Sequence, residues 1–169
     1  LIAGWQNDQQ MPQNLTMLSN LLSPLSKLSL QLQHTTLLQG TKAYRAHLAP
    51  MTIPGPEREA RHPHKNFFCL QEDFLREQAA RHNWAFTIWR PQIIFGHALN
   101  APMNMLAALG AYAALQSHQG LSLSYPGGPS GVMEAIDADI LARAIRFAWS
   151  NDAFANETFN ITNGDVFRM

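Results

Sequence analysis

Apolar residues recur along the first forty positions at helical spacing and then at strand spacing. Leucines stand three or four residues apart between Leu15 and Leu28, which predicts an amphipathic helix over 11–29. Pro24 lies inside this pattern, so we expect it to kink the helix or split it in two. The short segment His34–Gln39 is β-branched and apolar, and it predicts a strand buried in a parallel sheet.

The next apolar pattern predicts a helix that begins after Asn66, a good N-cap, and runs to about His82. We expect its buried face to carry Phe67, Leu70, Phe74 and Leu75, and its more exposed side to carry Glu72, Arg76 and Glu77. A second strand, Ala85–Trp89, follows and stops at Arg90-Pro91. This strand-helix-strand order predicts a parallel sheet with ligands outside the carboxyl ends of its strands. Loops at 40–44 and 91–96 would then lie on one ligand-binding edge.

The second half of the chain carries a different kind of helix. The segment Met103–Leu115 is apolar nearly all round, so we expect it to be buried, or covered by a missing part or a partner. Asp137 is predicted to cap a later helix whose inward face carries Ile140, Leu141, Ala144, Ile145 and Ala148. Glu157–Thr162 predicts a further strand, closed by a turn at 163–165.

Composition excludes several classes of protein. Twelve Lys and Arg balance 12 Asp and Glu, which argues against a nucleic-acid groove or a polybasic membrane patch. The longest apolar run, Met105–Leu115, is shorter than the ~18 to 20 residues that a membrane span needs. The single cysteine, Cys69, excludes an internal disulfide framework and a multi-thiolate metal site, and it predicts a reducing, cytoplasmic location.

Lys42 is the first candidate for chemistry, because it directly follows the first predicted strand. A lysine at the carboxyl end of a parallel strand can reach a cofactor ribose, or raise the acidity of a neighbouring hydroxyl by its charge. The alternative is an ordinary solvated lysine in a loop.

Other chemistry has less support. His62 and His64 have no further ligand at metal spacing, so a polar loop is the better interpretation and no metal site is predicted. Cys69 has no base beside it, which favours a buried structural thiol. The chain has no Gly-x-Ser-x-Gly elbow and no dinucleotide glycine motif, and the glycine-rich segment 125–131 is typical of a surface turn. The residues alone therefore predict a ligand-binding edge without naming a reaction.

Four motifs, in order along the chain, resemble one family. They are LQGTKAY at 38–44, NFFCLQED at 66–73, RPQIIFG at 90–96 and NETFNITNGDVF at 156–167. Over nearly the whole chain they are similar to the progesterone 5β-reductase/iridoid synthase-like (PRISE) group of atypical extended short-chain dehydrogenases/reductases. The resemblance implies an α/β fold: the second half of a partial Rossmann-like, doubly wound parallel sheet, plus part of a small substrate-side region.

The resemblance also implies a division of the chain. Residues 1–100 would be the C-terminal half of an NAD(P)-binding domain, without its first strands and glycine-rich loop. Residues 101–169 would supply substrate-side helices and a remaining strand, both incomplete. We therefore expect an interior fragment of a longer reductase, inactive alone and prone to associate, with a homo-oligomer as one outcome.

By the same resemblance, particular residues receive roles. Lys42 matches the catalytic lysine of the family, and Phe68 occupies the position of its catalytic tyrosine. Gln39 is expected to line the NADPH pocket, and Pro91 and Ile94 to flank the nicotinamide; NADH is the alternative cofactor.

The exchange of tyrosine for Phe68 leaves more than one hypothesis. Loss of a single hydrogen-bond donor to a developing oxyanion costs about 10²–10³ in rate. The leading hypothesis is a partial NAD(P)H-dependent reductase of the C=C bond of an enone, or of a carbonyl, in a small hydrophobic substrate. The rival is a catalytically impaired Rossmann-fold binding protein. A nucleotide-sugar epimerase or dehydratase would need a Tyr-x-x-x-Lys motif, which Phe68 and Glu72 do not provide. Tyr44 offers a second hydroxyl, but the family has a tyrosine there too, so a structural role is the better interpretation.

Overall fold

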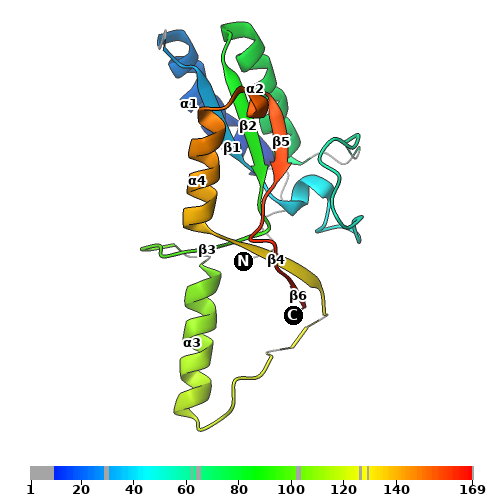
Figure 1. Ribbon diagram of the computed structural model, residues 1–169, viewed down its shortest axis with the longest axis vertical. Coiled ribbons are helices and arrows are strands. Elements are labelled where there is room, and N and C mark those ends of the chain that lie inside the picture. Colours follow the sequence, from blue (N-terminus) through cyan, green and yellow to red (C-terminus); the bar gives the residue numbers. More distant parts are fainter. Residues whose placement is uncertain are drawn as a thin grey trace. The chain divides into compact units, whose positions relative to one another are not determined.

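The computed structural model describes residues 10–28, 31–61, 63, 66–101, 104–125, 127–128 and 130–168 (Figure 1). The chain divides into two compact units. The first unit comprises residues 1–90 and 146–160, and the second comprises 91–145 and 161–169. Gln39, Lys42 and Phe68 fall in the first unit, and Pro91 and Ile94 in the second.

The first unit is built on three parallel strands, β1 (His34–Leu38), β2 (Ala85–Arg90) and β5 (Glu157–Asn160), in the order β1-β2-β5. The three arrows lie side by side in Figure 1. Strands β1 and β2 pair from His34 opposite Ala85 to Leu38 opposite Trp89. The predicted strand-helix-strand crossover is therefore confirmed, and both strands end at the same edge of the sheet.

Two α-helices belong to this unit, α1 (Gln10–Leu28) and α2 (Phe67–His82), together with two 3₁₀ helices, η2 (Thr41–Tyr44) and η3 (Asp152–Phe154). Pro24 lies within one continuous α1, so the expected split into two helices is wrong. The predicted cap of α2 is confirmed, because Asn66 Oδ1 accepts a hydrogen bond of 3.1 Å from the Cys69 N–H.

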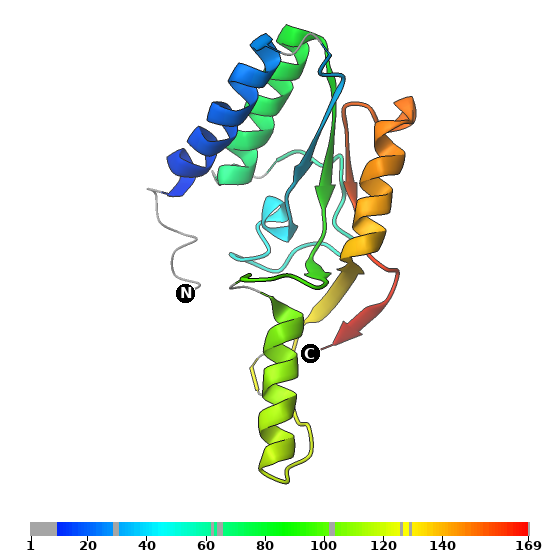
Figure 2. The ribbon, with the colours of Figure 1, turned by 90° about the vertical axis from the view of Figure 1, so that its left-hand side faces the viewer.

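The core of the first unit lies between these two helices and the sheet. Figure 2 shows α1 and α2 side by side, next to β1 and β2. The buried cluster contains six side chains from α1, α2, β2 and the residue before β2: Leu22, Leu75, Ala79, Trp84, Phe86 and Ile88. On the other face of β2, Trp89 lies 5.4 Å from Phe159 and 6.1 Å from Phe154, measured between ring centroids.

Two expectations about burial in this unit are wrong. Most of β1 is only half-buried, because β2 pairs with it on one side and no described strand pairs with the other. Glu72 is buried, although its charge predicted exposure. It stands three and seven residues before Leu75 and Ala79, so the helical period places it on the core face of α2.

The second unit contains three short strands, β3 (Ile93–Phe95), β4 (Val132–Asp137) and β6 (Val166–Arg168). Strand β4 pairs in parallel with β3 and antiparallel with β6. The expectation of a loop over 91–96 is thus wrong at its centre, where three residues form β3. A three-residue strand has too few positions to show an alternating pattern.

Helix α3 (Met105–His118) has no buried residue, so the described chain does not cover its apolar surface. Leu106 and Leu115 are 52% and 59% exposed. Of the two sequence-based alternatives, burial is wrong, and cover by a further segment or a partner stays a prediction.

Helix α4 (Ala138–Trp149) begins as predicted, because Asp137 Oδ1 accepts a hydrogen bond of 2.8 Å from the Asp139 N–H. Leu141 and Ala148 are buried, but Ile140 is exposed, so its predicted inward position is wrong. Strand β5 ends at Asn160 rather than Thr162. Within the described ranges, no helix is both long enough and apolar enough to cross a bilayer.

Candidate functional site

The carboxyl edge of β1 and β2 brings together several of the predicted site residues. The backbone N–H of Gln39 donates a hydrogen bond of 2.8 Å to the carbonyl of Trp89, so the first residue after β1 is fixed against the end of β2. The chain then turns directly into η2, the 3₁₀ helix that carries Lys42. The position of Lys42 thus follows from where β1 ends.

Lys42 is half-buried in η2, and burial lowers the pKa of its ammonium group below the ordinary value, because desolvation disfavours the charged form. Asn66, the cap of α2, also reaches this helix. Its Nδ2 donates a hydrogen bond of 3.4 Å to the backbone carbonyl of Lys42. One asparagine therefore connects η2 to the start of α2.

Phe68 is half-buried in the first turn of α2. Its ring lies against Phe67, with 4.3 Å between ring centroids. Its backbone carbonyl accepts a hydrogen bond of 3.1 Å from Gln39 Nε2. Lys42 and Phe68, the two positions that the resemblance marks as catalytic, thus lie on neighbouring elements held by Asn66 and Gln39.

The side chain of Gln39 is buried, and both the nitrogen and the oxygen of its amide group form hydrogen bonds with protein groups. Its Nε2 donates to Phe68, and its Oε1 accepts a hydrogen bond of 3.0 Å from Arg90 Nε. Arg90, the last residue of β2, is itself only 9% exposed. A cofactor contact by Gln39 stays a prediction, and the structure shows this side chain engaged within the protein.

Glu72 balances the buried charge of Arg90. Its Oε2 lies 3.3 Å from Arg90 Nη2, while its Oε1 lies 2.8 Å from Arg76 and 3.1 Å from Arg61. Burial alone would raise the pKa of the Glu72 carboxyl, but the hydrogen bond from Arg76 and the charge of Arg61 outweigh it. The pKa of Glu72 is therefore held below its ordinary value.

Tyr44 makes structural contacts, as its sequence context favoured. Its hydroxyl donates a hydrogen bond of 2.8 Å to Asn160 Oδ1, which fixes η2 to the end of β5. The guanidinium carbon of Arg90 lies 4.9 Å from the centroid of the Tyr44 ring. The hydroxyl is thus engaged at the sheet, and the ring supports Arg90.

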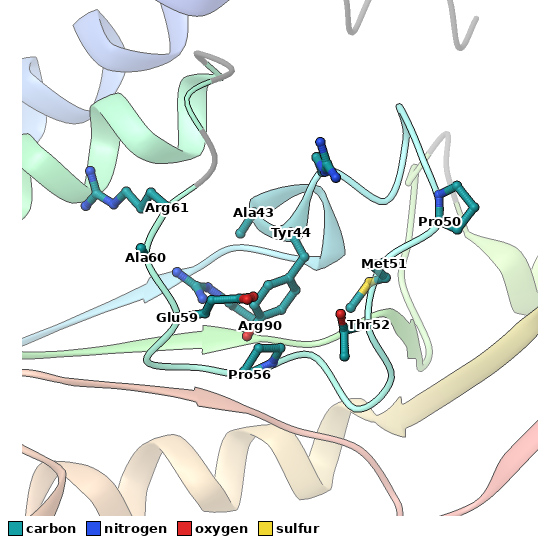
Figure 3. Close-up of a pocket in the computed structure, with 11 residues that line it drawn as sticks. Ala43, Tyr44, Pro50, Met51, Thr52, Pro56, Glu59, Ala60, Arg61 and Arg90 are labelled. Carbon is teal, nitrogen blue, oxygen red and sulfur yellow. The ribbon is translucent and has the colours of Figure 1, made fainter.

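A cavity of about 220 Å³ lies beside these residues (Figure 3). Tyr44, Glu59 and Arg90 extend toward one another in it, whereas Arg61 extends away. Lys42, Gln39 and Phe68 are not among its lining residues. The cavity therefore adjoins the predicted site through Tyr44 and Arg90 without containing its principal residues.

The remaining predicted residues lie elsewhere. Pro91 and Ile94 belong to the second unit, where Pro91 is buried and Ile94, in β3, is 41% exposed. Cys69 is a free, half-buried thiol. His62 and His64 lie outside the described residues, and the rest of the described chain holds no group of three His, Cys, Asp or Glu placed to bind a metal.

Sequence reasoning missed Arg90 and Glu72 as members of this site. A signal was present, because strand residues alternate between faces and Arg90 continues the buried series of Phe86 and Ile88. A charged residue at such a position needs a buried partner. The helical spacing of Glu72 from Leu75 offered one.

Curated proteins match nearly the whole chain. It is 30% identical to "(S)-8-oxocitronellyl enol synthase" of Catharanthus roseus over 98% of its length, and 33% identical to "3-oxo-Delta(4,5)-steroid 5-beta-reductase" of Arabidopsis thaliana over 97%. The matches cover 45% and 46% of those relatives, so the chain spans about half their length. No family model matches the chain.

Solved structures match the fold at lower identity. UDP-glucose 4-epimerase from Thermotoga maritima, solved with UDP-glucose, superposes with a TM-score of 0.70 at 19% identity, over 95% of this chain and 50% of that one. RMD from Pseudomonas aeruginosa, complexed with NADPH, gives 0.69 at 19% identity, over 91% and 52%. These likenesses confirm the predicted partial Rossmann-like α/β fold.

Proposed function

We propose that this chain, which is homologous along nearly its whole length to the progesterone 5β-reductase/iridoid synthase-like group of extended short-chain dehydrogenases/reductases, carries the lysine side of an NAD(P)H-dependent reductase site. The substrate is a small hydrophobic compound with an activated C=C bond, as in an enone, or with a carbonyl. NADPH is the preferred cofactor, and NADH is the alternative.

The observation that carries this proposal is the place of Lys42. The motif match to the family puts a lysine at this position, and the fold puts it directly after β1, on the edge where parallel α/β sheets bind ligands. An ordinary loop lysine would need neither the half-buried η2 nor the bond from Asn66 to its carbonyl. Both features support a functional lysine.

The donor chemistry of this edge fits the ribose end of a nicotinamide cofactor. The Lys42 ammonium offers N–H donors to ribose hydroxyls and a positive charge to an oxygen that becomes negative during reduction. The cofactor, when bound, supplies the hydride. Lys42 would orient it and lower the pKa of a nearby hydroxyl or water, with Pro91 and Ile94 expected beside the ring and Gln39 beside the pocket.

Phe68 supports a second candidate function, a Rossmann-fold binding protein with impaired catalysis. A phenylalanine keeps the ring of the family tyrosine and lacks its hydroxyl, so it donates no hydrogen bond to a substrate oxygen. Tyr44 does not replace that donor in this structure, because its hydroxyl is bonded to Asn160. The two candidates make opposite predictions for the restoration of a tyrosine at position 68.

The test uses the protein expressed from the longest reading frame that contains these 169 residues. Cofactor binding is titrated by the fluorescence of NADPH, and turnover is measured as oxidation of NADPH with a panel of hydrophobic enones and carbonyl compounds. We expect binding and slow turnover, abolished by Lys42→Met but not by Lys27→Met on α1. If the protein neither bound NADPH nor oxidised it with any compound of the panel, the proposed reductase would be refuted.

Location and assembly complete the proposal. We propose a cytoplasmic protein, which the presence of a single cysteine, Cys69, supports, because small proteins of oxidising compartments are often rich in disulfides. We also propose self-association through apolar surface such as that of α3.

A further inference from the structure

We propose that Arg90 is a positioning residue of the reductase site: from the end of β2 it holds η2, Gln39 and α2 in the arrangement that presents Lys42 and position 68. The inference rests on the proposed function and deepens it.

Strand geometry gives Arg90 its direction. Alternate residues of β2 face the same side, so Arg90 follows Phe86 and Ile88 toward the core cluster that β2 shares with α2. Arg90 is 9% exposed, and an isolated guanidinium at that depth would be very costly. The buried guanidinium at the end of β2 therefore depends on its hydrogen-bonding partners.

Three elements contact this one side chain in three directions. Arg90 Nε donates to Gln39 Oε1 at 3.0 Å, just after β1, and Nη2 donates to Glu72 Oε2 at 3.3 Å, on α2. The guanidinium carbon of Arg90 lies over the Tyr44 ring of η2, 4.9 Å from its centroid. Figure 3 shows Arg90 and Tyr44 lying close together at the cavity.

These contacts continue to the candidate catalytic positions. Gln39, once fixed by Arg90, donates through Nε2 to the carbonyl of Phe68 at 3.1 Å. Tyr44 is two residues from Lys42 on the same turn of η2. Arg90 is thus one contact away from the element that carries Lys42 and two hydrogen bonds away from the backbone of Phe68.

A lysine at position 90 would keep the charge and lose the geometry. Its single nitrogen at the end of a flexible stem cannot donate to Gln39 and Glu72 along a rigid fork while a planar group lies on Tyr44. Glu72 would keep Arg61 and Arg76, so its carboxylate stays neutralised in the variant. Arg90→Lys therefore separates positioning from charge balance.

Arg76 supplies a matched control. It also bonds to Glu72, at 2.8 Å, and also lies over an aromatic ring, with 4.9 Å to the centroid of Phe86. Its side-chain hydrogen bonds go to Glu72 and not to Gln39, and its ring contact is with Phe86 and not with Tyr44. Arg76→Lys thus perturbs the same carboxylate and the same kind of ring contact outside the chain of contacts to Lys42 and Phe68.

The experiment compares the parent protein from the longest reading frame with Arg90→Lys and Arg76→Lys. We expect Arg90→Lys to lower kcat about 10- to 100-fold with a much smaller change in the KM for NADPH, because misplacement of reacting groups acts mainly on the chemical step. Arg76→Lys is expected to keep the parent kcat. An active parent with equal kcat in all three proteins would overturn the positioning role.

A second readout does not depend on turnover. Hydrogen exchange of the Gln39 side-chain amide, followed by NMR, should accelerate in Arg90→Lys and not in Arg76→Lys, since of these two arginines it is Arg90 that donates to Gln39 Oε1. Unchanged exchange would overturn the inference. Absence of turnover in the parent would instead refute the proposed function, while the exchange measurement still decides whether Arg90 holds Gln39.

Discussion

Phe68 and Lys42 carry the chemistry of the proposed site, and their local contacts differ in kind. Gln39 bonds to the backbone carbonyl of Phe68, so a substitution of the Phe68 side chain can keep this hydrogen bond. Lys42 sits on a half-buried turn that lowers the pKa of its ammonium. Lys42 was a candidate because it follows the first predicted strand, and the family motifs then gave it a role and singled out Phe68. Neither helical nor strand periodicity distinguishes a catalytic lysine from a solvated one.

Phe68→Tyr tests the candidate site at this scale. If the site is a reductase site that lacks one oxyanion donor, the new phenol should raise kcat with an enone by about 10²–10³. Phe67→Tyr, on the adjacent residue of the same helix, serves as the control and should leave kcat unchanged. No gain from Phe68→Tyr would favour the binding protein or a different route for the proton.

The roles of Arg90 and Glu72 could not be predicted from local sequence in the same way. Arg90 bonds to Gln39, 51 residues away along the chain, and to Glu72, 18 residues away, so only the folded chain brings these residues together. What the sequence does contain is their register. Arg90 lies on the buried face of β2 and Glu72 on the buried face of α2, and both violate the expectation that charge is exposed.

The four α-helices and the strands β1, β2 and β5 were predicted from the sequence, whereas β4, although it has six residues, was missed. The apolar spacing in α2 and β2 extends over several residues, and it correctly predicted the parallel crossover. The type of residue before α2 correctly predicted Asn66 as its cap. Strands β3 and β6 have three residues each and leave no periodic pattern. Helix α3 is apolar on every side, so its sequence could not show which face is covered.

Helix α2 contains an internal comparison of two ion pairs with the same spacing. Glu72–Arg76 is buried at its carboxylate, whereas Glu77–Arg81 is exposed at both ends. Glu72→Gln leaves the buried Arg90 without its carboxylate and should lower the free energy of unfolding by about 3–5 kcal/mol. Glu77→Gln should cost about 0.3–0.5 kcal/mol. Urea denaturation at neutral pH measures both, and equal effects would contradict the buried network.

The same carboxylate predicts a pH dependence. The pKa of Glu72 is lower in the folded chain than in the unfolded chain, so its stabilising contribution is complete above the ordinary glutamate value of about 4.3. The contribution is lost as pH falls through the lower, folded pKa. Glu72→Gln should therefore flatten the loss of stability below about pH 4.3, as denaturation at a series of pH values would show. An unchanged acid slope would contradict the lowered pKa.

The chain as a whole forms two compact units, and the residues to which the resemblance gives roles are found in each. Lys42, Phe68 and Gln39 belong to the first, and Pro91 and Ile94 to the second. The overall fold class was predictable, because the order of strand, helix and strand already limits the topology. One feature of the two compact units has no local signal in the sequence: residues 146–160 belong to the first unit, where β5 pairs with β2 over a long separation in the chain.

Exposed apolar surface gives a prediction for the molecule as a whole. Leu106 and Leu115 of α3 are both more than half exposed, so we expect association that increases with concentration. Sedimentation velocity should show smaller species after Leu106→Gln and Leu115→Gln, and no change after Ser117→Gln on the same helix. A protein that is monomeric at every concentration would contradict this expectation.

Transfer of a labelled hydride is the most direct test of whether Lys42 belongs to the site of an NAD(P)H-dependent reductase. The protein from the longest reading frame is incubated with a hydrophobic enone and NADPH deuterated at one or the other face of the nicotinamide C4, and the product is analysed by mass spectrometry and NMR. A reductase site at Lys42 should give one deuterium at the β-carbon from only one of the two labelled cofactors, more product with Phe68→Tyr, and none with Lys42→Met. Product without deuterium from either cofactor, or no product even with Phe68→Tyr, would contradict it.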